Sequence, residues 1–170
     1  MLRIIRHLLA IAVLPFSVTV LIPVWLARRS DIPLAVGSDA REIAGQALGA
    51  VLLGLGLLLF GATFRKFDRD GQGTLAPWDP PRRLVVRGPY AYVRNPMISG
   101  VVMVLLGEAL VLLSRPHLEW ALLFFAINAV SIPLIEEPML RERFGEDYRE
   151  YCRHVPRLLP RLRPWRPGTD

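Results

Sequence analysis

Long apolar runs alternate with charged, proline-rich segments along the chain. Residues 7–27 (HLLAIAVLPFSVTVLIPVWLA) contain no Asp, Glu, Lys or Arg, and residues 43–64 form an equally long second run. Two later runs, residues 97–113 and 118–135, are shorter, and each carries a polar residue. About 20 apolar residues suffice to cross a hydrocarbon core. The pattern therefore predicts an all-α, multi-span membrane helix bundle with about four spans, or five.

The composition changes near residue 63. Residues 1–63 contain two almost purely apolar runs and predict a two-helix N-terminal anchor, whose second span carries many small residues on which another helix can pack closely. Residues 64–170, rich in charge and proline, predict a catalytic core with two spans and a C-terminal helix. A signal peptide is the alternative interpretation of the first run, but its 21 residues favour a retained anchor.

The net charge of +6 and the pI near 10.4 raise the question of a nucleic-acid partner. With four spans, 17 of the 21 Arg and Lys residues fall in the N-terminus, the loop at 65–96 and the C-terminal tail. The positive-inside rule explains this asymmetry without nucleic acid. It predicts a multi-pass protein of the cytoplasmic (inner) membrane with both termini in the cytoplasm. The single Cys152 and three scattered histidines predict no metal site.

The segment from residue 65 to residue 96 is punctuated by glycine and proline, which exclude a long helix. About 30 residues of irregular backbone usually mark a functional loop. A flexible linker is the alternative, but Trp78, Tyr90 and Tyr92 offer more apolar surface than a linker exposes. We therefore expect a cytoplasmic loop that contributes to a site.

The charged segment after the last span has one apolar stripe. Leu140, Phe144, Tyr148 and Tyr151 recur at helical spacing, which predicts an amphipathic helix over residues 138–153 that lies on the protein or on the membrane surface. Four arginines in and after this helix are expected near anionic lipid headgroups: Arg153, Arg157, Arg161 and Arg163.

Two adjacent carboxylates, Glu136 and Glu137, stand at the inner end of the last span. They repel each other and lose hydration there, so they need a cationic partner. Arg141, four residues after Glu137, could form an ordinary helix ion pair. The functional alternative is that at least one carboxylate holds the ammonium group of a ligand.

The stretch GPYAYVRNPMISG supplies the complementary groups. Pro96 predicts the start of the third span with Asn95 as its N-cap, so that free N–H groups point into the loop. Tyr90 and Tyr92 add aromatic faces, and Arg94 adds a cation. An aromatic belt at the membrane interface explains these three side chains as well, but not the pair of glutamates.

The blocks RRLVVRGPYAYVRNPMISG and EEPMLRERFGEDYREYCRHVPRLLP match a known series in order and spacing. They resemble the membrane-integral methyltransferases typified by isoprenylcysteine carboxyl methyltransferase, which are similar to the phospholipid N-methyltransferases. The resemblance covers roughly residues 64 to 160. It implies an S-adenosyl-L-methionine pocket that the cytoplasmic loop and the C-terminal helix form together.

By position, the resemblance implies the following site residues. The catalytic group would be Glu136, Glu137 and Arg94, and the cofactor contacts would be Arg82, Arg83, Leu84, Val85, Tyr90, Asn95, Pro96, Met97, Ile98 and Glu136.

Three positions depart from the family pattern. Asn95 replaces the usual histidine, Ile98 replaces a common tyrosine, and Ile132 replaces an arginine that bears on the substrate carboxylate in the eukaryotic enzymes. The expected partners are therefore a lipidic or isoprenoid-like acceptor, not specifically a prenylcysteine, and membrane lipids. A non-catalytic scaffold, a transporter-like subunit or a protein of this fold without transferase activity is the alternative.

Glu108 lies 11 residues into the third span, about 16 Å deep at 1.5 Å per residue. A carboxylate at that depth is a functional candidate. A role in the acceptor site and a protonated pair with Asn128 both remain open.

Overall fold

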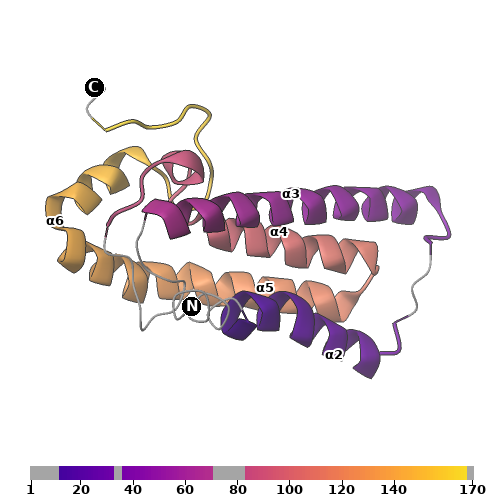
Figure 1. Cartoon of the computed structure of the whole chain (residues 1–170). Helices are drawn as coiled ribbons and strands as arrows, with labels where there is room; N and C mark the ends of the chain where they lie inside the picture. Colours follow the sequence, from indigo (N-terminus) through magenta and orange to yellow (C-terminus); the bar gives the residue numbers. More distant parts are fainter. Residues whose placement is uncertain (1–11, 33–35, 71–82, 168–170) are drawn as a thin grey trace. The chain divides into compact units, whose positions relative to one another are not determined.

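The computed structural model describes residues 12–32, 36–70 and 83–167 (Figure 1). This part of the chain is helical and contains no strand, which confirms the all-α prediction for the described residues. In chain order the elements are η1 (Ala12–Leu21), α2 (Ile22–Arg29), α3 (Ala40–Asp70), η2 (Gly88–Ala91), α4 (Pro96–Val111), α5 (Arg115–Ser131), η3 (Ile132–Glu136) and α6 (Glu137–His154).

Two continuous helical stretches among the described residues are long and apolar enough to cross a membrane: Ala40–Lys66 and Arg115–His154. The apolar helix α4 is shorter. The second stretch has 40 residues, about twice what a bilayer requires. Its apolar part ends at Ile135, so the charged residues that follow lie outside the spanning segment. The number of four or five spans stays a prediction.

The chain divides into two compact units, which we describe separately. Unit 1 comprises residues 1–58 and 100–126, and unit 2 comprises residues 59–99 and 127–170. The division into an anchor (1–63) and a catalytic core (64–170) stays a prediction.

In unit 1, two glycine pairs bring the backbones of α3 and α4 together. A Cβ atom added to Gly49 would lie 2.8 Å from the carbonyl oxygen of Gly107, and one added to Gly56 would lie 2.8 Å from that of Gly100. A side chain at either place would separate the helices. The predicted close packing through small residues is thus confirmed at these two positions, whereas a Cβ at Gly54 would meet nothing within 4 Å.

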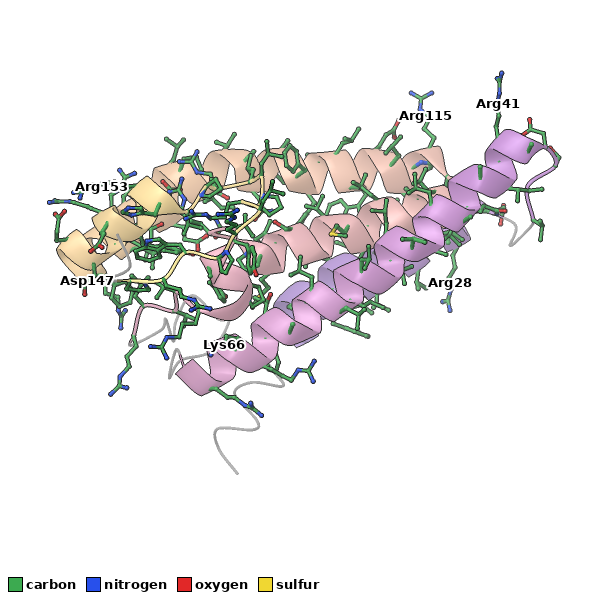
Figure 2. All side chains as sticks on the ribbon, turned by 90° about the horizontal axis from the view of Figure 1, so that it is seen from above. Arg28, Arg41, Lys66, Arg115, Asp147 and Arg153 are labelled. Atoms are coloured by element: carbon green, nitrogen blue, oxygen red, sulfur yellow. The ribbon has the colours of Figure 1, made fainter. Side chains whose placement is uncertain are left out.

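Polar contacts also fix the ends of the helices in unit 1. His117 Nε2 lies 3.1 Å from the Pro23 carbonyl oxygen, and His117 Nδ1 lies 2.7 Å from Ser114 Oγ. Because a carbonyl only accepts, Nε2 carries the proton and Nδ1 accepts from the serine. His117 therefore has a structural role. Figure 2 shows Arg28, Arg41 and Arg115 gathered at one end of this unit.

In unit 2, the aromatic core forms on one face of α6. Tyr148, Tyr151, Val155 and Trp165 are buried together, and the side chains packed against them come from α6 and from the loop before α4: Leu84, Val86, Leu140, Phe144 and Cys152. The predicted amphipathic helix is confirmed, and its apolar stripe packs on the protein. Gly145 kinks this helix at φ 56°, a conformation that favours glycine.

Candidate functional site

The loop that precedes α4 is a packed part of unit 2. Val85, Ala91 and Val93 are buried. Gly88 adopts φ 66°, and a Cβ there would lie 3.4 Å from the Lys66 side chain. Residues 83–95 are thus a packed part of the unit, not a flexible linker; residues 71–82 lie outside the described residues.

The C-terminal segment after α6 runs alongside this loop (Figure 1). Its main chain is joined to the loop by three hydrogen bonds: Arg94 N to Pro156 O (2.9 Å), Arg161 N to Tyr92 O (3.0 Å) and Trp165 N to Ala91 O (2.9 Å). The Tyr151 hydroxyl also donates to the Tyr90 carbonyl at 2.8 Å. The loop is therefore held between α6 and the C-terminal segment.

Glu137 is the centre of an ion-pair network from three parts of unit 2. Arg94 Nη1 lies 2.9 Å from Oε1, Arg157 donates from Nε (2.7 Å) and Nη2 (2.9 Å), and Arg141 Nη2 lies 3.3 Å from Oε2. The Glu137 side chain is only 1% exposed. Burial alone raises the pKa of this carboxyl, but the Arg157 hydrogen bonds and the three positive charges outweigh it and lower the pKa. Glu137 is thus a buried, ionised group that ties the loop, α6 and the tail together.

Glu136 has a different environment, although it is the neighbouring residue. Glu136 is the last residue of η3, a π-helical turn in which the Glu137 N–H donates to the Ile132 carbonyl. Two prolines, Pro133 and Pro138, lie within and just after this turn. Such π-bulges frequently occur at functional sites. Successive helical residues point about 100° apart, so burying Glu137 leaves Glu136 exposed. Within the part of the chain that the structure describes, Glu136 forms no hydrogen bond or ion pair.

The Glu136 carboxyl is exposed, but its pKa is raised. Burial among neighbouring protein atoms, and then the charge of Glu137, raise its pKa, yet the residue keeps an exposed surface. The charge of Glu136 also acts on Tyr90. Burial raises the pKa of the Tyr90 phenol, and the Glu136 carboxylate raises it further. The Glu136 carboxylate, which has no partner among the described residues, therefore acts electrostatically on the neutral Tyr90 phenol of the loop.

The start of α4 lies where the sequence predicts it. Pro96 begins the helix, and the Asn95 carbonyl accepts the hydrogen bonds of Ser99 N and Ser99 Oγ, both at 3.1 Å. Among the described residues, the Asn95 side chain itself forms no hydrogen bond. Its amide therefore does not cap the helix, and it is available to a ligand. Pro96 is fully buried, whereas Met97 and Ile98 are half-buried.

The remaining predicted cofactor contacts have different environments. Arg82 lies outside the described residues. Arg83 is exposed, Leu84 packs against the aromatic core, and Val85 is buried. The roles of all these residues in binding stay predictions.

Sequence reasoning missed two members of the network. Arg157, expected at lipid headgroups, instead makes the bidentate contact with Glu137. Cys152 Sγ accepts a hydrogen bond from Arg94 Nη1 at 3.0 Å. The sequence indicated that Glu137 needs cationic partners. It could not identify Arg157, 20 residues further on, because that contact depends on how the chain turns after α6.

Two other arginines expected at headgroups are also engaged within the protein. Arg153 pairs with Glu146, and Arg161 Nη1 donates to the His154 carbonyl at 2.8 Å. Of the four arginines, Arg163 is exposed and has no partner among the described residues.

Comparison with known families identifies the chain. The phospholipid methyltransferase family model matches residues 44–147, more than half of the sequence. The chain belongs to the phospholipid methyltransferase family. It is thus a membrane methyltransferase by family, and its relatives act on lipids. No curated protein and no solved structure matches the chain. The matched region includes α4, α5 and both glutamates, and it ends before Cys152 and Arg157.

Proposed function

We propose that the protein uses S-adenosyl-L-methionine to methylate a lipidic or isoprenoid-like acceptor, at a carboxylate oxygen or an amine nitrogen. One observation carries the proposal: among the described residues Glu136 is a carboxylate without a partner, its charge acts on the Tyr90 phenol, and it adjoins a glutamate that three arginines already neutralise. A carboxylate that is open to a ligand is suited to the ammonium of the cofactor's amino-acid part.

The neighbouring groups suit the rest of such a ligand. The Asn95 amide and the first N–H groups of α4 offer donors to a carboxylate. Tyr90 offers a ring and a phenol that the charge of Glu136 reaches. Arg83, Leu84, Val85, Met97 and Ile98 are the further expected contacts, Leu84 and Val85 through their backbone because their side chains pack inward.

Arg94 and Glu137 act by positioning in this proposal. Arg94 is the residue just before Asn95, and its guanidinium binds Glu137, the residue just after Glu136. One ion pair of 2.9 Å therefore sets the distance between the two cofactor-binding segments. The catalytic group expected from the sequence thus separates into one ligand-binding carboxylate and a pair that holds it in place.

The bound sulfonium would supply an already activated methyl group, so the chain's main task is to orient the acceptor near it. An amine acceptor would also need a group to take its proton, whereas a carboxylate acceptor would not. In the proposed topology of four spans with both termini in the cytoplasm, Glu136 lies at the inner-membrane boundary. A polar cofactor can reach that level from the cytoplasm and a lipid can reach it from the bilayer.

The test is methyl transfer by the full chain in nanodiscs. The protein is incubated with methyl-labelled S-adenosyl-L-methionine and a total lipid extract, and the labelled lipids are identified by mass spectrometry. The proposal expects label in a lipid fraction with the native protein and loss of that label with Glu136→Gln. Cofactor binding without any transfer would instead support a protein of this fold that lacks transferase activity.

A further inference from the structure

The C-terminal segment 156–167 is held rigidly although it has no helix or strand. The three main-chain hydrogen bonds to the loop fix Pro156, Arg161 and Trp165. The buried Trp165 also contacts the Tyr151 ring, with centroids 5.8 Å apart, and stacks on His154 at 5.2 Å. The side chains between these fixed points therefore have defined directions.

Three leucines in this segment point away from the protein. Leu158 is 44% exposed, Leu159 is 81% exposed and Leu162 is 98% exposed. Pro156, Pro160 and Pro164 prevent a helix, so the leucines cannot turn their apolar surface back onto the unit as α6 does. Large apolar side chains held out in this way gain free energy when another apolar phase covers them.

The charge of the segment indicates which apolar phase covers the three leucines. Residues 156–167 include four arginines and no acidic residue, and Arg163 directly follows Leu162 and is exposed. Apolar side chains interleaved with cations match the boundary between acyl chains and anionic headgroups. Unit 2 also contains the inner end of the last span, where Leu134 and Ile135 are exposed, and the first turn of α6, where Met139 is exposed. A bilayer surface is therefore available to the same unit.

We propose that Leu158, Leu159 and Leu162 insert into the cytoplasmic leaflet of an anionic bilayer, with Arg163 at the headgroups. The segment is thus a second membrane attachment, independent of the spans. Because Arg157 lies within it and binds Glu137, the attachment also braces the network beside Glu136. The family match ends at residue 147, so this surface lies beyond the matched region.

Photocrosslinking from single positions tests the insertion. The photoreactive amino acid benzoylphenylalanine replaces Leu159 or Leu162 in the full chain, in nanodiscs of phosphatidylcholine with or without phosphatidylglycerol. The control position is Asp147, an exposed residue on α6 (Figure 2). Both leucines are exposed, so the replacement leaves the packing of unit 2 intact. Mass spectrometry identifies the adducts without using enzyme activity, so the result does not depend on the proposed function.

We expect lipid adducts from positions 159 and 162 and few from position 147. Arg163→Gln should reduce the preference for phosphatidylglycerol adducts about fivefold, as expected for one arginine near an anionic surface. Adducts with a second copy of the chain or with another segment of it would overturn the proposal. So would a lipid yield at positions 159 and 162 equal to that at position 147.

Discussion

Glu137→Gln is the substitution that most sharply tests the buried network. The amide keeps the shape of the side chain but removes the charge that three arginines share. Arg94 is the most affected partner because its side chain is only 13% exposed, whereas Arg141 and Arg157 can turn toward water. Removing one partner from a buried ion pair typically costs about 3–5 kcal/mol.

We expect the lower end of that range, about 3 kcal/mol, because two of the three arginines can regain hydration. For a chain of this size, that corresponds to a fall in Tm of roughly 6–12 °C. Glu146→Gln is the matched control. Glu146 also pairs with two arginines, Arg149 and Arg153, but in the open, where ion pairs contribute little. It should leave Tm nearly unchanged.

The pH dependence gives a second readout. The folded-state pKa of Glu137 is lowered, so its stabilisation is complete above the unfolded value, near 4.3, and is lost as the pH falls through the folded pKa. The difference in Tm between the native protein and Glu137→Gln should therefore shrink below about pH 4. Thermal unfolding in detergent, followed by tryptophan fluorescence, measures both effects. A loss for Glu137→Gln no larger than that for Glu146→Gln would refute the reasoning.

Three further substitutions test other parts of the structure. Gly56→Ala places a Cβ 2.8 Å from the Gly100 carbonyl oxygen and should lower the free energy of unfolding in denaturant by about 1–3 kcal/mol. The control Gly54→Ala, where a Cβ meets nothing within 4 Å, should not lower it. Equal effects would contradict the close packing of α3 and α4. Gly145→Ala meets no atom but must adopt φ 56°, so it should lower the free energy of unfolding by about 1–2 kcal/mol, and an unchanged value would mean that α6 has no such kink. Glu108→Gln should leave cofactor affinity unchanged in calorimetry, and a large loss would place Glu108 in the cofactor site.

Local patterns in the sequence predicted which segments are helical, but not all of their ends: α3 continues to Asp70, six residues past the predicted end of the second run at residue 64, and α6 follows α5 and η3 without a break. Pro96 has a fixed φ and no N–H to lose, so the start of α4 could be placed to the residue. The apolar stripe of α6 similarly predicted which face would be buried. Glu136 and Glu137 were expected to form a site because adjacent carboxylates at a membrane boundary are costly without partners, and their role in binding stays a prediction.

The distinction between the two glutamates could not be read from the sequence. It depends on the π-helical turn at Ile132–Glu136, which decides which carboxylate turns inward. It also depends on Arg157, which reaches Glu137 only because the chain reverses after His154 and pairs with the loop. Contacts between segments far apart in the chain have no periodic signature, so Arg157 was instead expected at the lipid surface.

The role of Glu136 is the centre of the proposed function, and binding of S-adenosyl-L-methionine to the detergent-purified full chain tests it most directly. Isothermal titration calorimetry should show binding to the native protein and an affinity at least tenfold lower for Glu136→Gln, a loss of about 1.4 kcal/mol. The control is Glu142→Gln, which changes an exposed glutamate on α6 and should leave the affinity unchanged. Absence of binding to the native protein, or equal affinity of the two variants, would contradict the account.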